Sequence, residues 1–103
     1  MKAIFNGVVI AESDKCKVVE GNQYFPPDSI KKEYFKPSSM HTICPWKGKA
    51  SYYTVDVKGK VAEDAAWYYS NPSFLAKKIK DHVAFYTDKV EVSEWKIIIE
   101  IFL

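Results

Sequence analysis

Residues 41–53 hold most of the reactive residue types of the chain within thirteen positions. They include one of the two cysteines, one of the two histidines, a tryptophan, two lysines, a glycine and two tyrosines. A cysteine does chemistry only where neighbouring groups favour its thiolate and water can reach it. His41 and Lys47 each lie three positions from Cys44, so either is a candidate for such a neighbour. The segment therefore indicates a pocket centred on this cysteine.

Two kinds of function fit such a pocket, and the residues leave both open. In one, the chain binds a small molecule in an aromatic pocket around Cys44. In the other it is an enzyme: Cys44 is a nucleophile or redox thiol, His41 acts as its base, and Asp64 on a neighbouring strand orients the imidazole. A free cysteine is also commonly a small buried hydrophobe, so catalysis does not follow from Cys44 alone. The candidate ligand-binding residues are Tyr24, Trp46, Lys47, Tyr52 and Trp67.

The cysteines and histidines do not have the pattern of a metal site. Zinc sites commonly use four ligands, often in C-x-x-C pairs. This chain offers two cysteines and two histidines, spread over positions 16–82 and without a C-x-x-C pair. It also lacks the glycine-rich motifs that bind phosphates and dinucleotides. We therefore expect neither a metal nor another cofactor.

The kind of positive charge bears on possible partners. The net charge is only +2, and all fifteen basic residues are lysines. Lysine acts as a point charge, whereas arginine provides the bidentate fork that recognises guanine edges. We therefore expect no sequence-specific binding of nucleic acid.

The sequence also favours a cytoplasmic location. No apolar segment resembles a signal peptide, and none approaches the ~20 residues of a membrane helix. The two cysteines are twenty-eight positions apart and do not form the dense framework of a secreted disulfide protein. A cytosolic protein with reduced thiols, not attached to a membrane, is the expectation.

The turn signals predict a mainly β (α+β) fold. At 103 residues the chain is expected to form one domain, with a core at 1–94 and an apolar extension at 95–103. Asn6-Gly7 and Lys58-Gly59 predict tight turns between short antiparallel strands. Residues 32–35 are predicted to form another short strand that ends before Pro37. One helix is predicted near 72–80, with Ser70 or Asn71 as its cap. The strands are expected to form bent, tent-like or barrel-like sheets.

The order of several motifs resembles a known family. The motif Cys-Pro-Trp-Lys-Gly at 44–48 is followed by Ala-Ala-Trp at 65–67. Further matching segments are Asn6-Gly7, 10–13, 24–26, 50–52 and 83–86. Together, from Ala3 to Val92, they resemble the family catalogued as domain of unknown function 427.

That resemblance implies a mainly β fold similar to the tent-like sheets of some zinc-binding exchange factors and sulfoxide reductases. Those proteins carry C-x-x-C zinc pairs that this chain lacks, so their metal is not carried over. The family name includes a nucleotidyltransferase label, but the chain has no Gly-Ser followed by an Asp-x-Asp pair. The resemblance therefore implies a fold more than an activity.

The segment 95–103 is unusually apolar, with two charges in nine residues. An unpaired strand of this kind invites association with another chain. It is expected either to be the last strand of the chain's own sheet or to join two subunits, which makes the chain a homo-oligomeric interaction module.

We predict that the chain is a homodimer with residues 95–103 at or near the interface. Light scattering of the full chain at tens of micromolar should give the mass of two chains, and deletion of 95–103 should give a folded monomer. If the segment instead packs on its own sheet, deletion should unfold the domain, because each lost large side chain costs ~1.5–3 kcal/mol of burial. A monomeric full-length chain would contradict the dimer.

Overall fold

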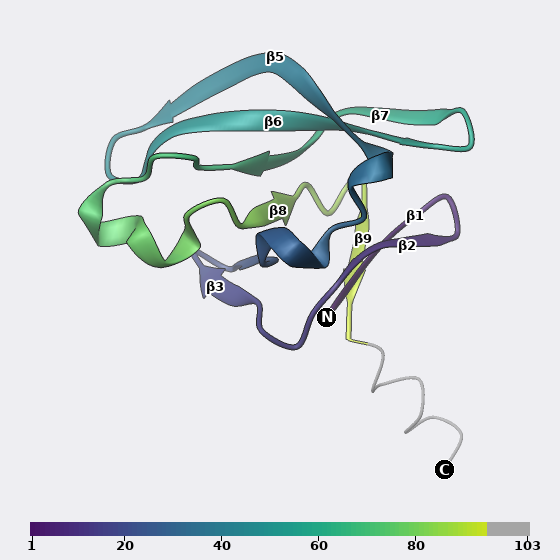
Figure 1. The fold of residues 1–103 in the computed structure, drawn as a ribbon, viewed down its shortest axis with the longest axis horizontal. Helices are drawn as coiled ribbons and strands as arrows, with labels where there is room; N and C mark the ends of the chain where they lie inside the picture. The colour runs from purple at the N-terminus through teal and green to yellow at the C-terminus, as the bar shows by residue number, and fades with distance from the viewer. Residues whose placement is uncertain (95–103) are drawn as a thin grey trace.

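A computed structural model of the chain describes residues 1–94 as three antiparallel sheets. Figure 1 shows the four-stranded sheet β5-β6-β7-β8 across the top of the view, with β2-β1-β9 and β3-β4 below it. The strands are β1 (Lys2–Phe5), β2 (Val8–Glu12), β3 (Lys17–Val19), β4 (Asn22–Tyr24), β5 (Phe35–Cys44), β6 (Gly48–Val57), β7 (Lys60–Tyr68), β8 (Val83–Phe85) and β9 (Glu91–Ser93). The predicted mainly β class with antiparallel strands is confirmed.

The two predicted tight turns form as their residues require. Asn6 and Gly7 have φ of 50° and 75°, and Lys58 and Gly59 have φ of 54° and 85°. Positive φ at both central residues defines the type I′ turn, whose twist matches that of the flanking strands. These turns join β1 to β2 and β6 to β7.

The prediction for residues 32–35 is wrong. Lys32–Tyr34 forms a short 3-10 helix, η2, and the strand β5 begins at Phe35 and continues through Pro37. β5 is an edge strand of its sheet, and proline is tolerated there because its missing N–H need not face a neighbouring strand. Proline therefore does not end this strand.

Strands β6 and β7 direct alternate side chains to two different apolar clusters, because successive residues of a strand point to opposite faces. Tyr53 and Ala66 belong to or pack against one cluster, whereas Tyr52 and Trp67 belong to the other. The first, here the large core, consists of Ala3, Phe5, Ile10, Ala11, Phe25, Phe35, Val55, Val57, Ala65, Ala66, Val83, Phe85 and Val90. The second, here the aromatic cluster, consists of Tyr24, Ala50, Tyr52, Trp67, Tyr69, Ala76, Ile79 and Ala84.

The helix predicted near 72–80 is a 3-10 helix, η3 (Phe74–Ile79), with a kink at Ala76. Ala76 and Ile79 are buried, and their spacing of three matches the 3-10 repeat. Phe74 and Leu75 are exposed. The position before the helix is Ser73, which makes no side-chain cap, so neither expected cap residue serves.

The predicted C-terminal strand at 95–103 lies outside the described residues. Within residues 1–94, the structure contains no helix of the length and apolar character that spanning a membrane would require.

Replacing Ile10 should test the large core. Ile10 is completely buried, so Ile10→Ala should lower the free energy of unfolding by about 2–5 kcal/mol through lost burial and the cavity left behind. Ile43→Ala is the matched control: this side chain is 74% exposed on β5, and its loss should cost less than about 1 kcal/mol. Urea unfolding measures both, and equal costs would contradict this assignment of the core.

Candidate functional site

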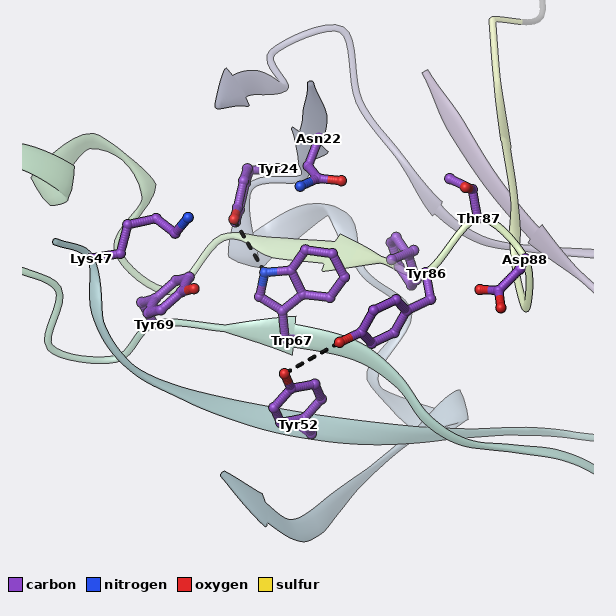
Figure 2. A pocket seen from close by; sticks show the side chains of 10 residues that line it. Asn22, Tyr24, Lys47, Tyr52, Trp67, Tyr69, Tyr86, Thr87 and Asp88 are labelled. Atoms are coloured by element: carbon purple, nitrogen blue, oxygen red, sulfur yellow. Dashed lines mark hydrogen bonds between the residues drawn. The ribbon is translucent and has the colours of Figure 1, made fainter. Parts of the chain in front are cut away.

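A cavity of about 480 Å³ opens beside the aromatic cluster, and residues from β4, β6, β7 and the end of β8 line it. Figure 2 shows these side chains around a common space, with Trp67 at its centre. The lining residues are Asn22, Tyr24, Lys47, Tyr52, Trp67, Tyr69, Phe85, Tyr86, Thr87 and Asp88.

The rings that form the walls are held against one another. The Trp67 ring meets Tyr24 edge-on at 6.3 Å between centroids and lies 4.7 Å from Tyr86. Tyr86 stacks in turn on Tyr52 at an interplanar angle of 9°. Edge-on and offset pairs are the favoured arrangements of aromatic rings, so the walls are ordered without a ligand.

The polar tips of these rings are also connected. The indole Nε1 of Trp67 donates to the Tyr24 hydroxyl at 3.1 Å. The Tyr52 hydroxyl lies 2.9 Å from Thr42 Oγ1 and 3.4 Å from the Tyr86 hydroxyl (Figure 2). Because the polar atoms of Trp67, Tyr24 and Tyr52 have partners, these buried rings avoid the cost of an unsatisfied group.

Two of the phenols are held firmly in the protonated form. Burial raises the pKa of Tyr69 to about 12. The hydrogen bond with Tyr52, together with burial, raises the pKa of Tyr86 to about 12. At neutral pH these hydroxyls are therefore neutral groups that can donate or accept.

Lys47 is the only charged side chain buried among residues 1–94. Its ammonium forms an ion pair with Glu20 and lies 4.9 Å from the ring centre of Trp46 and 5.8 Å from that of Tyr69. Burial among the rings opposes the charge, but the hydrogen bond with Glu20 and attraction to the neighbouring tyrosine and cysteine side chains together outweigh it and raise the pKa of Lys47. The same bond lowers the pKa of Glu20. Lys47 therefore stays charged inside an aromatic wall.

The turn that carries Lys47 is fixed by the segment before η3. Ser73 donates its backbone N–H to the Lys47 carbonyl at 2.9 Å and its hydroxyl to the Trp46 carbonyl. Gly48 has φ of +112°, and a Cβ there would lie 3.4 Å from the Asn71 carbonyl oxygen. This close approach in the left-handed region explains why a glycine follows the lysine.

Cys44 ends β5 and packs against the aromatic cluster, although it does not line the cavity. Burial raises the pKa of its thiol. Backbone N–H groups of Lys47 and Trp46 and the nearby Lys47 ammonium outweigh that effect, so the pKa lies below its ordinary value. Lys47 is thus a neighbour that favours the thiolate, as the sequence suggested.

The other two residues of the predicted catalytic set lie elsewhere. His41 is three positions from Cys44 in a regularly paired part of β5, so it points to the opposite face, where its Nδ1 lies 3.3 Å from Ser51 Oγ. Asp64 sits at a break in the register of β7, with φ of 51°, and accepts a hydrogen bond from Ser38. The structure does not bring these two side chains to Cys44.

The structure brings four of the five predicted ligand-binding residues to one cavity: Tyr24, Lys47, Tyr52 and Trp67. The fifth, Trp46, is 38% exposed, stacks near the Lys47 ammonium and does not line the cavity.

Sequence reasoning missed six lining residues, namely Asn22, Tyr69, Phe85, Tyr86, Thr87 and Asp88. Tyr69 could have been found, because it follows Trp67 by two positions and so shares its face. Tyr86 reaches the cavity only because β8 pairs with β7, with Ala84 opposite Trp67. That long-range pairing has no local signal.

Within the described part of the chain, no group of three or more His, Cys, Asp or Glu side chains is placed to hold a metal ion. The second cysteine, Cys16, lines a separate cavity of about 460 Å³ near the N-terminus. The pKa of the Cys16 thiol is raised, and burial is the largest cause. The two cysteines therefore differ in electrostatic surroundings.

We predict that Cys44 reacts with iodoacetamide faster than Cys16 does at neutral pH. An ordinary cysteine titrates near ~8.5 and only the thiolate reacts, so a lowered pKa moves the half-maximal rate to lower pH and a raised one to higher pH. The rates are measured against pH on Cys16→Ser and Cys44→Ser, each of which retains one thiol. Equal rates at every pH would show that the main-chain donors do not stabilise the Cys44 thiolate.

One known family matches almost the whole chain. No curated protein matches the chain. The model of a family described as domain of unknown function (DUF427) matches residues 1–96 of the 103. The match includes every residue that lines the aromatic cavity, and it confirms the resemblance drawn from the 44–48 motif. The chain belongs to the DUF427 family.

Proposed function

We propose that this protein binds a small ring-shaped molecule in the aromatic cavity. The observation that carries the proposal is a cavity of about 480 Å³ whose walls are tyrosine and tryptophan rings with interconnected polar tips. Sites for small molecules have volumes of about 300–1,000 Å³, largely apolar walls and a few convergent polar groups. This cavity has the volume and the convergent polar groups, and its apolar surface comes from the faces of its aromatic rings.

The packing of the wall rings against one another also supports the binding of a ligand. The Trp67, Tyr86 and Tyr52 rings already hold one another, so little side-chain freedom remains to be lost when a ligand enters. A planar ring can pack against them, since aromatic pairs contribute about 0.5–1.5 kcal/mol beyond simple burial. A flat, one- or two-ring compound is therefore the favoured class of ligand.

Thiol chemistry at Cys44 is a second candidate function. Its support is the lowered pKa that two backbone N–H groups and Lys47 produce. Here the main-chain donors stabilise the Cys44 thiolate, whose proton is lost to water, so no histidine base is needed. A role as a homo-oligomeric interaction module rests on residues 95–103 alone.

Tyr86→Ala should test the binding proposal. Tyr86 is 39% exposed and packs on two other wall rings, so its loss removes a wall while exposing little core. We expect binding of a two-ring compound such as naphthol to weaken about threefold to tenfold, the equivalent of one lost ring contact. Ligand-observed NMR titration measures the dissociation constants.

Phe74→Ala is the control, because it removes an aromatic ring that is 85% exposed and outside the cavity. It should leave the dissociation constant unchanged. If the two variants bind equally, or if the unaltered protein binds no ring compound at millimolar concentration, the cavity is not the proposed site.

A further inference from the structure

The Lys47 ammonium is a positive charge already removed from water at one end of the cavity. Its side chain is 7% exposed, against 52% for the side chain of its partner Glu20. The cost of burying the ammonium is therefore borne by the folded protein before any ligand arrives. An anion that enters the cavity meets a cation with little water to lose.

A second donor lies at the same end. Figure 2 shows the Lys47 ammonium directed toward the Tyr24 hydroxyl. That hydroxyl oxygen accepts from Trp67 Nε1, which leaves its own proton available for an acceptor in the cavity. Burial raises the pKa of Tyr24, so the proton stays on. An ammonium and a phenol together suit one small anionic group.

Glu20 indicates which anion that is. It reaches Lys47 from the turn between β3 and β4, where its carboxylate also accepts from Trp46 Nε1 at 3.4 Å. Because this side chain is half in water, it can return to solvent at low cost. The Lys47 ammonium thus already pairs with a carboxylate, which comes from a residue outside the cavity lining and can move away.

The opposite end of the cavity disfavours more negative charge. Asp88 lies there, well separated from Lys47 in Figure 2. One ammonium balances one negative charge, and the described part of the chain offers no second cation among the lining residues. A group with two negative charges, such as a phosphate monoester, fits this balance poorly.

We propose that the ligand of the aromatic cavity is a planar ring compound bearing a single carboxylate, which replaces the Glu20 carboxylate on the Lys47 ammonium. The ring packs against Trp67 and the carboxylate accepts from Lys47 and Tyr24. This inference rests on the cavity being a small-molecule site and adds the chemical class of its ligand.

Calorimetric titration of the full chain with three probes tests the proposal. Naphthoate, naphthamide and naphthyl phosphate share a ring system and differ only in the polar group. Naphthoate should bind about tenfold more tightly than the neutral amide, since the amide cannot pair with a buried charge. Naphthyl phosphate should bind more weakly than naphthoate.

Two variants separate the charge exchange from the ring contacts. Lys47→Met keeps the apolar stem of the side chain and should reduce the preference for naphthoate over naphthamide to less than about twofold. Glu20→Gln removes the competing carboxylate and should tighten naphthoate binding about threefold or more. Glu33→Gln, an exposed change of the same kind outside the cavity, is the control for net charge and should change neither affinity.

The outcomes distinguish this inference from the proposed function. Equal binding of naphthoate and naphthamide overturns the carboxylate assignment but leaves a ring-binding cavity. Tighter binding of naphthyl phosphate also overturns it. If Lys47→Met does not fold, Glu20→Gln decides, because unchanged or weaker naphthoate binding there excludes the exchange. If no probe binds, both proposals fail.

Discussion

The constraint on which the structure depends is that β6 and the second half of β7 carry buried side chains on both faces. Tyr52 and Trp67 face the cavity, while their sequence neighbours Tyr53 and Ala66 face or pack against the large core. A register shift of one residue would exchange these sets, placing wall rings in the core and core residues in the cavity. The register is therefore strongly specified. Packing of the large core on one face of β6 and β7 fixes the positions of the cavity rings on the other face.

Lys47 adds the one charge that this arrangement must accommodate. A buried ammonium requires a partner, and the ion pair with Glu20 connects the turn after β3 to the turn after β5. A pair whose acid is half in water stabilises a fold only weakly. Methionine or leucine would pack against Trp46 and Tyr69 without the cost of desolvating a charge. The lysine is therefore better explained by the proposed binding of an anion than by stability.

The parts of this molecule that were predictable are those set by local chemistry. Asn6-Gly7 and Lys58-Gly59 require positive φ, which fixes two hairpins without reference to the rest of the chain. The reading of Pro37 as a strand end failed because its effect depends on whether the strand lies at an edge, and sheet order sets that. Residues 74–79 form a 3-10 helix with only Ala76 and Ile79 buried, which is too little apolar contact to hold a longer α-helix in place.

The site was partly predictable for the same reason. Tyr52 and Trp67 lie on β6 and β7, the two strands that follow the 44–48 motif, and the alternation of side chains along each strand predicts their face. Tyr86 joins them only through the pairing of β8 with β7. His41 was placed beside Cys44 on sequence proximity, yet an uninterrupted strand sends residues three apart to opposite faces. Lys47 contributes to both candidate functions. Its ammonium lies at the cavity, and its backbone N–H donates to the Cys44 thiol. Because only the ammonium belongs to the side chain, a change of that side chain removes the cavity charge while the main-chain support of the thiolate remains.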